Sequence, residues 1–269
     1  MNTGDMTELR HLQLVIMQIM KDIDDICRRN DIDYYLNGGS AIGAIRHKGF
    51  IPWDDDLDIM MTYDNYERFI KACREQLDPQ KYYVQEGLKD WPLNYTKIKL
   101  IGTCFDEREA YAKEEWQKGI FIDVFKMDNT SSNRLLQFWQ YACAKYRVCY
   151  LMGKRTYKSA NWKKKIFMAS AFPQNIGFIR RFFEWQSELY NGKQTEFIAS
   201  FYESKRFKKC IFRREVFGKP LRVQFEDAML PVPADYDSYL TTSFGDYMKL
   251  PPEEERQLKH LTKIDFGKY

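Results

Sequence analysis

The sequence predicts an α+β fold, in which a small mixed sheet is flanked by helices and carries a helical basic insertion. Three observations lead to this prediction. Apolar residues near the N-terminus recur at alternating three- and four-residue steps, the period of an amphipathic helix. Short apolar segments bounded by Gly, Pro or Asp follow, as is typical of strands. The middle of the chain, by contrast, is basic and aromatic.

The elements are expected in a simple order. A first helix runs from Leu9 to near Asn30 and should pack across the sheet. A later helix is stopped by Asp78-Pro79, because proline cannot continue a helix. In chain order, the elements after the first helix are a strand at 33–36, a helix at 40–46, an Asp-x-Asp strand from 56, a helix at 64–77, and strands at 82–84, 96–105 and 120–125.

The domain organisation follows from these elements. A chain of 269 residues forms one large domain or one domain with an insertion. We expect a catalytic core over 1–128 and a basic, aromatic-rich helical insertion over 129–205. Residues 206–269 should then complete the active site.

Four aspartates lie within five positions, at Asp54, Asp55, Asp56 and Asp58. Carboxylates this close repel one another, and burial would raise the cost of keeping them charged. Asp56 and Asp58 are two residues apart, so on a strand their side chains face the same way. A divalent cation between them would relieve the repulsion, and oxygen ligands suit magnesium or manganese. The alternative interpretation is a solvated acidic turn.

A glycine turn precedes the acidic run. Gly38, Gly39 and Ser40 follow a predicted strand and begin a helix, and such a turn lets backbone amides approach a phosphate. Arg46 and Lys48 could neutralise phosphate oxygens, although a solvated helix end, where cations favour the helix dipole, is the alternative.

Asp123 is a third candidate carboxylate, in the otherwise apolar strand at 120–125. An unpaired charge there would be costly, so Asp123 is expected to meet either a metal, as ligand or neighbouring general base, or a Lys or Arg in a structural salt bridge. Lys97 and Lys99 lie on the same face of another strand and could both point at phosphates. For Lys99 a solvated surface position is the favoured interpretation.

Between Asp128 and Glu184 there is no acidic residue, while eleven Lys or Arg occur, interleaved with aromatic residues. This composition is typical of an interfacial membrane element, so we expect contact with a peripheral membrane surface. Single-stranded nucleic acid also suits a basic, aromatic surface, but no nucleic-acid partner is expected here. A plain basic face of a helical insertion is the third interpretation.

Three blocks of sequence resemble one family. The stretch from Gly38 to Ile59, including Arg46-His-Lys-Gly-Phe-Ile-Pro-Trp-Asp-Asp-Asp-Leu-Asp, closely resembles the signature of the LicD family. A second block, Gly119–Phe125 with Asp128, resembles the family's next acidic strand, and a third, from Phe217-Gly218 to Pro251-Pro252, its C-terminal signature. Together the blocks touch roughly half of the chain, and 129–205 shows no family pattern.

The resemblance implies a nucleotidyltransferase-like fold and phosphocholine transfer. The donor would be CDP-choline or a similar CDP-alcohol, and an aromatic content of 16% is compatible with binding choline. The acceptor would be a hydroxyl of a cell-surface glycan or teichoic acid precursor, in many cases lipid-linked, and CMP would leave. The same signature could instead transfer another phospho-alcohol or a nucleotide, or the chain could be a non-catalytic membrane- or RNA-binding module.

The resemblance also assigns residues. Asp56, Asp58 and Asp123 would be catalytic and would hold Mg²⁺, with Mn²⁺ as the other candidate. The donor would be bound by the remaining candidates, and the resemblance favours Lys97 over Lys99. This donor-binding set is Gly38, Gly39, Ser40, Arg46, Lys48 and Lys97. The resemblance further suggests that Glu226, Asp227 and His260 approach the active site, without defined roles.

Sequence features also bear on location. No stretch of about 20 apolar residues exists, which argues against a conventional membrane span. The N-terminal region lacks the pattern of a signal peptide, and the six cysteines show no zinc-ligand spacing. We therefore expect a cytoplasmic protein with reduced thiols, peripheral on the inner face of the cell membrane.

Overall fold

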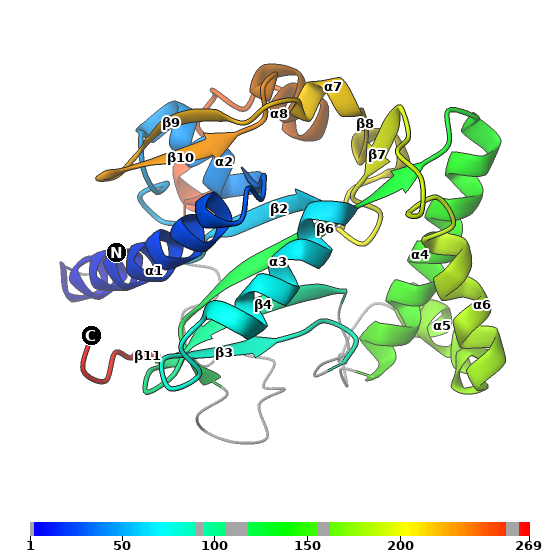
Figure 1. Cartoon of the computed structure of the whole chain (residues 1–269), viewed down its shortest axis with the longest axis horizontal. Helices are drawn as coiled ribbons and strands as arrows, with labels where there is room; N and C mark the ends of the chain where they lie inside the picture. Colours follow the sequence, from blue (N-terminus) through cyan, green and yellow to red (C-terminus); the bar gives the residue numbers. More distant parts are fainter. Residues whose placement is uncertain (1–2, 90–93, 106–117, 155–161, 257–263) are drawn as a thin grey trace.

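A mixed sheet forms the centre of the computed structural model, which describes residues 3–89, 94–105, 118–154, 162–256 and 264–269 (Figure 1). Its main path runs β1-β2-β6-β4-β3, and β7 and β8 extend it from the far end of β6. The strands are β1 (Tyr35–Leu36), β2 (Asp58–Thr62), β3 (Tyr82–Gln85), β4 (Tyr95–Leu100), β5 (Cys104–Phe105), β6 (Phe121–Thr130), β7 (Phe197–Ala199), β8 (Ile211–Arg213), β9 (Leu221–Phe225), β10 (Ala228–Val232) and β11 (Ile264–Asp265). The mixture of helices and strands confirms the predicted α+β class.

Helices cover the sheet and extend beyond it. They are α1 (Thr3–Arg29), α2 (Gly38–His47), α3 (Tyr63–Gln76), α4 (Arg134–Lys154), α5 (Trp162–Ser170), α6 (Gly177–Ser187), α7 (Arg214–Phe217) and α8 (Tyr236–Phe244), with 3-10 turns η2 (Phe172–Asn175), η3 (Phe207–Lys209) and η4 (Glu253–Glu255). Among the described helices, none is both long enough and apolar enough to cross a membrane.

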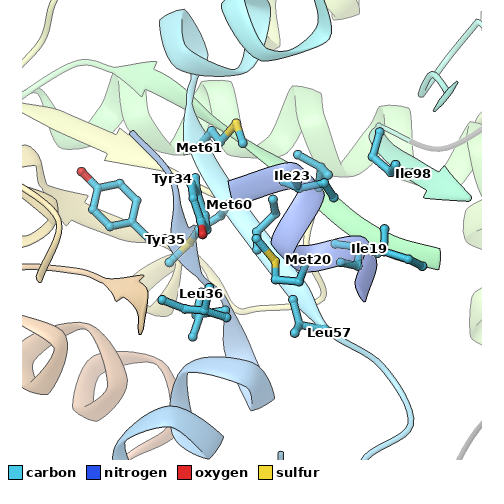
Figure 2. Packing of buried hydrophobic residues seen from close by; sticks show 14 of the residues in the cluster. Ile19, Met20, Ile23, Tyr34, Tyr35, Leu36, Leu57, Met60, Met61 and Ile98 are labelled. Atoms are coloured by element: carbon cyan, nitrogen blue, oxygen red, sulfur yellow. The ribbon is translucent and has the colours of Figure 1, made fainter. Parts of the chain in front are cut away.

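The main core lies between α1 and the sheet. The apolar stripe of α1 is fully buried, including Ile19, Met20 and Ile23, and it packs against Leu57 and Ile98 in one continuous cluster (Figure 2). The helix α3 lies beside α1 and contacts β2 and β6. The predicted first helix and its packing on the sheet are therefore confirmed.

The pairing of three strands decides where the polar residues meet. The parallel strands β2 and β6 place Asp58 beside Asp123. The antiparallel strand β4 places Lys97 on the other side of Asp123. Because residues in register on adjacent strands project to the same face, these three side chains form one row across the sheet.

Two elements differ from the sequence-based expectation. The strand expected at 96–105 is divided by a turn at Gly102, and its second part, β5, leaves the sheet to pair with β11. The strand expected to end at 125 continues to Thr130, because Asp128–Thr130 pair with β7. The stretch 129–205 is thus not only helical, since its end contributes the strand β7 to the sheet.

Candidate active site

The centre of the candidate site is the pair Asp58 and Asp123, at the start of β2 and near the start of β6. Neighbouring strands are about 4.8 Å apart, so two carboxylates in register lie close together. Burial raises the pKa of Asp58 well above its ordinary value, and the charges of Asp56, Asp123, Asp54 and Glu203 raise it further. The site is therefore a place where several carboxylates lie close together.

The loop before β2 adds to this charge. Asp54, Asp55 and Asp56 each offer an oxygen within 4.8 Å of the other two. The loop is held from α1, because Gln13 Nε2 donates a 2.9 Å hydrogen bond to the carbonyl of Asp54. Gly39 lies so near that a Cβ atom on it would be 2.7 Å from Asp54 Oδ2. Glycine at this position thus lets α2 approach the acidic loop without displacing the Asp54 carboxylate.

These side chains suit a divalent cation. Clustered carboxylate oxygens are the donors that Mg²⁺ and Mn²⁺ prefer, and a bound cation would relieve the repulsion that raises the pKa of Asp58. Of the predicted ligands, Asp56 and Asp123 both act electrostatically on Asp58, so the three lie near one another. The carboxylates found with ligand spacing among the described residues are Asp54, Asp55 and Asp56, so coordination of one cation by Asp56, Asp58 and Asp123 together stays a prediction. The structure also adds Asp54, which sequence reasoning did not select as a ligand.

Asp123 has a cationic partner as well. Lys97 Nζ lies 2.9 Å from Asp123 Oδ1, and its side chain is almost fully buried. The same ammonium lies 3.2 Å from the centre of the Phe121 ring. The structure thus contains the salt bridge that was the alternative interpretation, within the acidic row. The solvated position expected for Lys99 is wrong: Lys99 is only 6% exposed and lies over the same ring.

The glycine turn is built into the acidic centre. Gly38 has a positive φ of 53°, which glycine adopts without strain, and it begins α2. Ser40 Oγ accepts a 2.8 Å hydrogen bond from the backbone N–H of Asp58, so it ties α2 to β2. The Tyr239 hydroxyl of α8 donates to Asn37 Oδ1 and accepts from Gly38 N. A buried side chain of the 206–269 segment therefore supports this turn.

The two predicted cations at the end of α2 have other contacts. The Arg46 guanidinium donates to the carbonyls of Tyr247 and Lys249, at 2.7 and 3.2 Å, and so holds the C-terminal segment against α2. Lys48 ends α2 in a left-handed conformation, and its side chain is exposed. Their contact with phosphate stays a prediction.

Sequence reasoning missed two residues from the loop after β7. Glu203 lies near enough to raise the pKa of Asp58, and its Oε1 is buried without a hydrogen-bond partner among the described residues. Lys205 Nζ lies 3.0 Å from Glu203 Oε2 and 5.3 Å from the centre of the Tyr239 ring. Although burial opposes it, the pKa of Lys205 is raised by Tyr239 and Glu203. No local pattern marks these residues, because only the return of the chain after β7 brings them to the site.

Two other expected residues, Glu226 and Asp227, pair with side chains of α1. Glu226 pairs with Arg10 of α1, with Arg10 Nη2 2.5 Å from Glu226 Oε2, and it accepts a hydrogen bond from Phe50 N, so it holds the start of the acidic loop. Asp227 is exposed and pairs with Lys21. His260 lies outside the described residues.

Asp128 belongs to the opposite side of β6. It is five residues from Asp123, and side chains alternate along a strand, so the two carboxylates point to opposite faces. Asp128 is fully buried beside Lys126, and Asn191 donates to its Oδ1. Burial raises the pKa of Asp128 to about 6 although Lys126 opposes the shift. Asp128 is therefore not part of the acidic centre.

This chain is similar in sequence to several known proteins. The family model described as "LicD/FKTN/FKRP, nucleotidyltransferase domain" matches residues 31–151, which contain α2, β2 and β6. The lipopolysaccharide cholinephosphotransferase LicD of Haemophilus influenzae is 30% identical over 265 residues, which are 94% of this chain and 96% of that protein.

Two further relatives match a shorter part of this chain. An uncharacterized protein of Rickettsia prowazekii is 42% identical over 136 residues, 50% of this chain and 47% of that protein. The ribitol 5-phosphate transferase FKRP of Homo sapiens is 29% identical over 111 residues, 41% of this chain and 17% of that protein. The Haemophilus protein, by contrast, matches along nearly the whole of this chain.

Proposed function

Because this chain belongs to the LicD family, we propose that it transfers phosphocholine from CDP-choline to a hydroxyl of a cell-surface glycan, releasing CMP. The relative that matches along nearly the whole chain acts on lipopolysaccharide, which supports a glycan acceptor. The structural observation behind the proposal is the pairing of Asp58 with Asp123 next to the acidic loop. We further propose that the sheet is of the nucleotidyltransferase type, in line with the family description.

Asp56 and Asp58 are proposed to hold Mg²⁺ or Mn²⁺, with Asp54 beside them and Asp123 as a third ligand or as the base. A divalent cation there supplies positive charge that offsets the charge of the donor diphosphate. Gly38, Gly39 and the N-terminal amides of α2 face the same region and would contact donor phosphate.

The transfer itself requires a proton acceptor and a charged group for the leaving phosphate. The acceptor hydroxyl forms a bond to the phosphorus next to choline, and the bond from that phosphorus to CMP breaks. Asp123 takes the hydroxyl proton in this proposal, and its ion pair with Lys97 keeps its carboxylate charged beforehand. Lys205, which lies beside the Tyr239 ring that supports the Gly38 turn, would offset the charge that develops on CMP.

A product assay tests the proposal. The protein is incubated with Mg²⁺, a lipopolysaccharide or teichoic acid precursor, and CDP-choline, CDP-ribitol or CDP-ethanolamine in parallel. We expect CMP and a phosphocholine-bearing acceptor, both lost in an Asp58→Asn variant and on removal of Mg²⁺. Nucleotide attached to the acceptor, or no CMP from any CDP-alcohol, would refute the assignment.

Transfer of another phospho-alcohol is the second candidate. The ribitol 5-phosphate transferase FKRP matches 41% of this chain, and the family model that matches residues 31–151 names FKRP in its description. If CDP-ribitol supports CMP release and CDP-choline does not, the alcohol is reassigned while the phosphoryl chemistry stands.

The proposed location is cytoplasmic, at the inner face of the cell membrane. A lipid-linked acceptor would be presented there, so the enzyme would meet its substrate at a surface. Fractionation of cells that express the protein would test this, and recovery only outside the cell or only far from membranes would contradict it.

A further inference from the structure

The helix α6 turns its apolar side outward. Phe178, Phe182 and Trp185 are exposed, with Phe178 at 74% and Trp185 at 58%, and they follow one another at steps of four and three residues. Leu189, four residues after Trp185, is exposed just past the end of the helix. This spacing places the four side chains on one stripe of the helix surface. An amphipathic helix normally buries such a stripe.

The acidic side chains in and just after α6 face the protein instead. Glu188, just after the helix, pairs at 2.6 Å with Lys126, which is nearly buried on β6. Glu184 lies 3.6 Å from the buried Arg147 of α4. Since both carboxylates are directed toward buried cations, the side of α6 that packs on the protein is the polar one, and the apolar stripe is left on the outside. The inner side of α6 has its own partners, and the outer side has none among the described residues.

The neighbouring helix α4 continues this surface. Its indole residue Trp139 donates a hydrogen bond to Gln186 of α6, so the two helices lie side by side at this point (Figure 1). Trp139 is itself exposed, and Leu135, one turn earlier on α4, is 79% exposed. We call the exposed side chains Leu135, Trp139, Phe178, Phe182, Trp185 and Leu189 the α4–α6 face. It is larger than the scattered exposed apolar residues that every protein has.

Basic residues predominate in the part of the chain that carries most of this face. No acidic residue occurs in 129–183, and Arg134, Lys154, Lys165 and Arg181 are exposed in this part of the chain. Arg181 lies directly beside Phe182 on α6. Aromatic side chains flanked by Arg and Lys match an anionic lipid surface, where rings enter the headgroup region and cations meet the charge. A partner protein with a purely apolar surface would offer these cations no negative charge to pair with.

We propose that the α4–α6 face is the surface by which this protein docks on an anionic membrane. The inference deepens the proposed location at the membrane, and it requires neither the donor nor the chemistry of the acidic centre. The protein would be oriented by α6, with the aromatic stripe in the headgroup region and α4 alongside. Failure of the phosphotransfer assay would therefore leave this proposal intact, and failure of the vesicle-binding test would leave the proposed phosphotransfer intact.

Vesicle sedimentation tests the proposal with the full chain. Vesicles of phosphatidylcholine alone are compared with vesicles containing about one-third phosphatidylglycerol. We expect binding mainly to the anionic vesicles, and at least about tenfold weaker binding for the triple variant Phe178→Ser, Phe182→Ser, Trp185→Ser. The matched control, Leu221→Ser with Met229→Ser, removes two exposed apolar side chains of the β9–β10 hairpin and should bind like the native protein.

Other outcomes would overturn the proposal. It fails if native protein binds no vesicles, if the triple variant binds as well as the control, or if single-stranded RNA is the ligand whose binding the triple variant loses. It also fails if light scattering shows a dimer without lipid that the triple variant turns into a monomer. Should the triple variant not fold, quenching by brominated lipid decides the question in Trp185→Phe: this variant must lose part of the quenching seen in the native chain, since Trp139 of the same face remains.

Discussion

Replacing Asp58 with asparagine tests the acidic centre most directly. The backbone contacts of this residue are retained, because Ser40 Oγ and Asn37 N bond to its N–H and C=O and not to its side chain. What changes is one buried carboxylate in register with Asp123. Two charges about 4.8 Å apart repel by about 3 kcal/mol at an effective dielectric constant near 20. Without a cation, asparagine should therefore leave the free energy of unfolding unchanged or raise it, by up to that amount.

The effect on function should have the opposite sign. Asparagine offers the cation a neutral oxygen in place of a charged one, so binding of Mg²⁺ should weaken. We expect CMP release to fall by at least about 100-fold, the usual scale for losing one electrostatic contact in an active site. Stability kept or gained together with activity lost is the result that distinguishes an active-site carboxylate from a structural one.

Two measurements decide the matter. Thermal unfolding is followed with and without Mg²⁺, and CMP release is measured from CDP-choline. Native protein should unfold at a higher temperature when Mg²⁺ is present, and Asp58→Asn should lose this response. The matched control is Asp25→Asn, an exposed aspartate of α1 that pairs with Arg29. Normal turnover in Asp58→Asn, or a lower unfolding temperature than native without Mg²⁺, would show that our account of the site is wrong.

Three further substitutions test residues around the acidic centre. Glu226→Gln should lower the free energy of unfolding by about 1 kcal/mol near neutral pH, since the bond from Arg10 lowers the pKa of this carboxyl and the pair is partly exposed. The difference should begin to shrink as the pH falls below about 4, the ordinary range of a Glu carboxyl, and vanish only once the folded carboxyl, whose pKa is lower, is also protonated; a pH-independent loss in urea unfolding would contradict this. Gly39→Ala should lower activity at least about tenfold, because the added Cβ meets Asp54 Oδ2 at 2.7 Å. The control Gly192→Ala, whose Cβ would meet open space, should have no effect. Equal activities of the two variants would show that the acidic loop can shift to accommodate a side chain at position 39. Lys205→Met should lower kcat by about 100-fold and also lower the unfolding temperature, because the largely buried Glu203 loses its ion-pair partner; an unchanged kcat would remove Lys205 from the proposed mechanism.

Local sequence was sufficient for several elements. The three- and four-residue steps from Leu9 onward determined both the helix α1 and the side of it that is buried. The two-residue spacing of Asp56 and Asp58, and the glycine turn before α2, are short-range features of the same kind. Such features depend only on residues within a turn or two of each other, so periodicity and turn chemistry are enough to predict them.

Pairing over long distances decided the rest. Asp123 reaches Asp58 only because β6 pairs in parallel with β2 in this register. The chain has several apolar strands, and the sequence alone does not say which of them pair or in which register. Glu203, Lys205 and Tyr239 come to the same place through β7 and α8, far along the chain. Composition likewise marked the middle of the chain as basic and aromatic. Only the packing of Glu184 and Glu188 against buried cations determined that the apolar stripe of α6 faces outward, because which side of a helix is buried depends on what the rest of the fold places beside it.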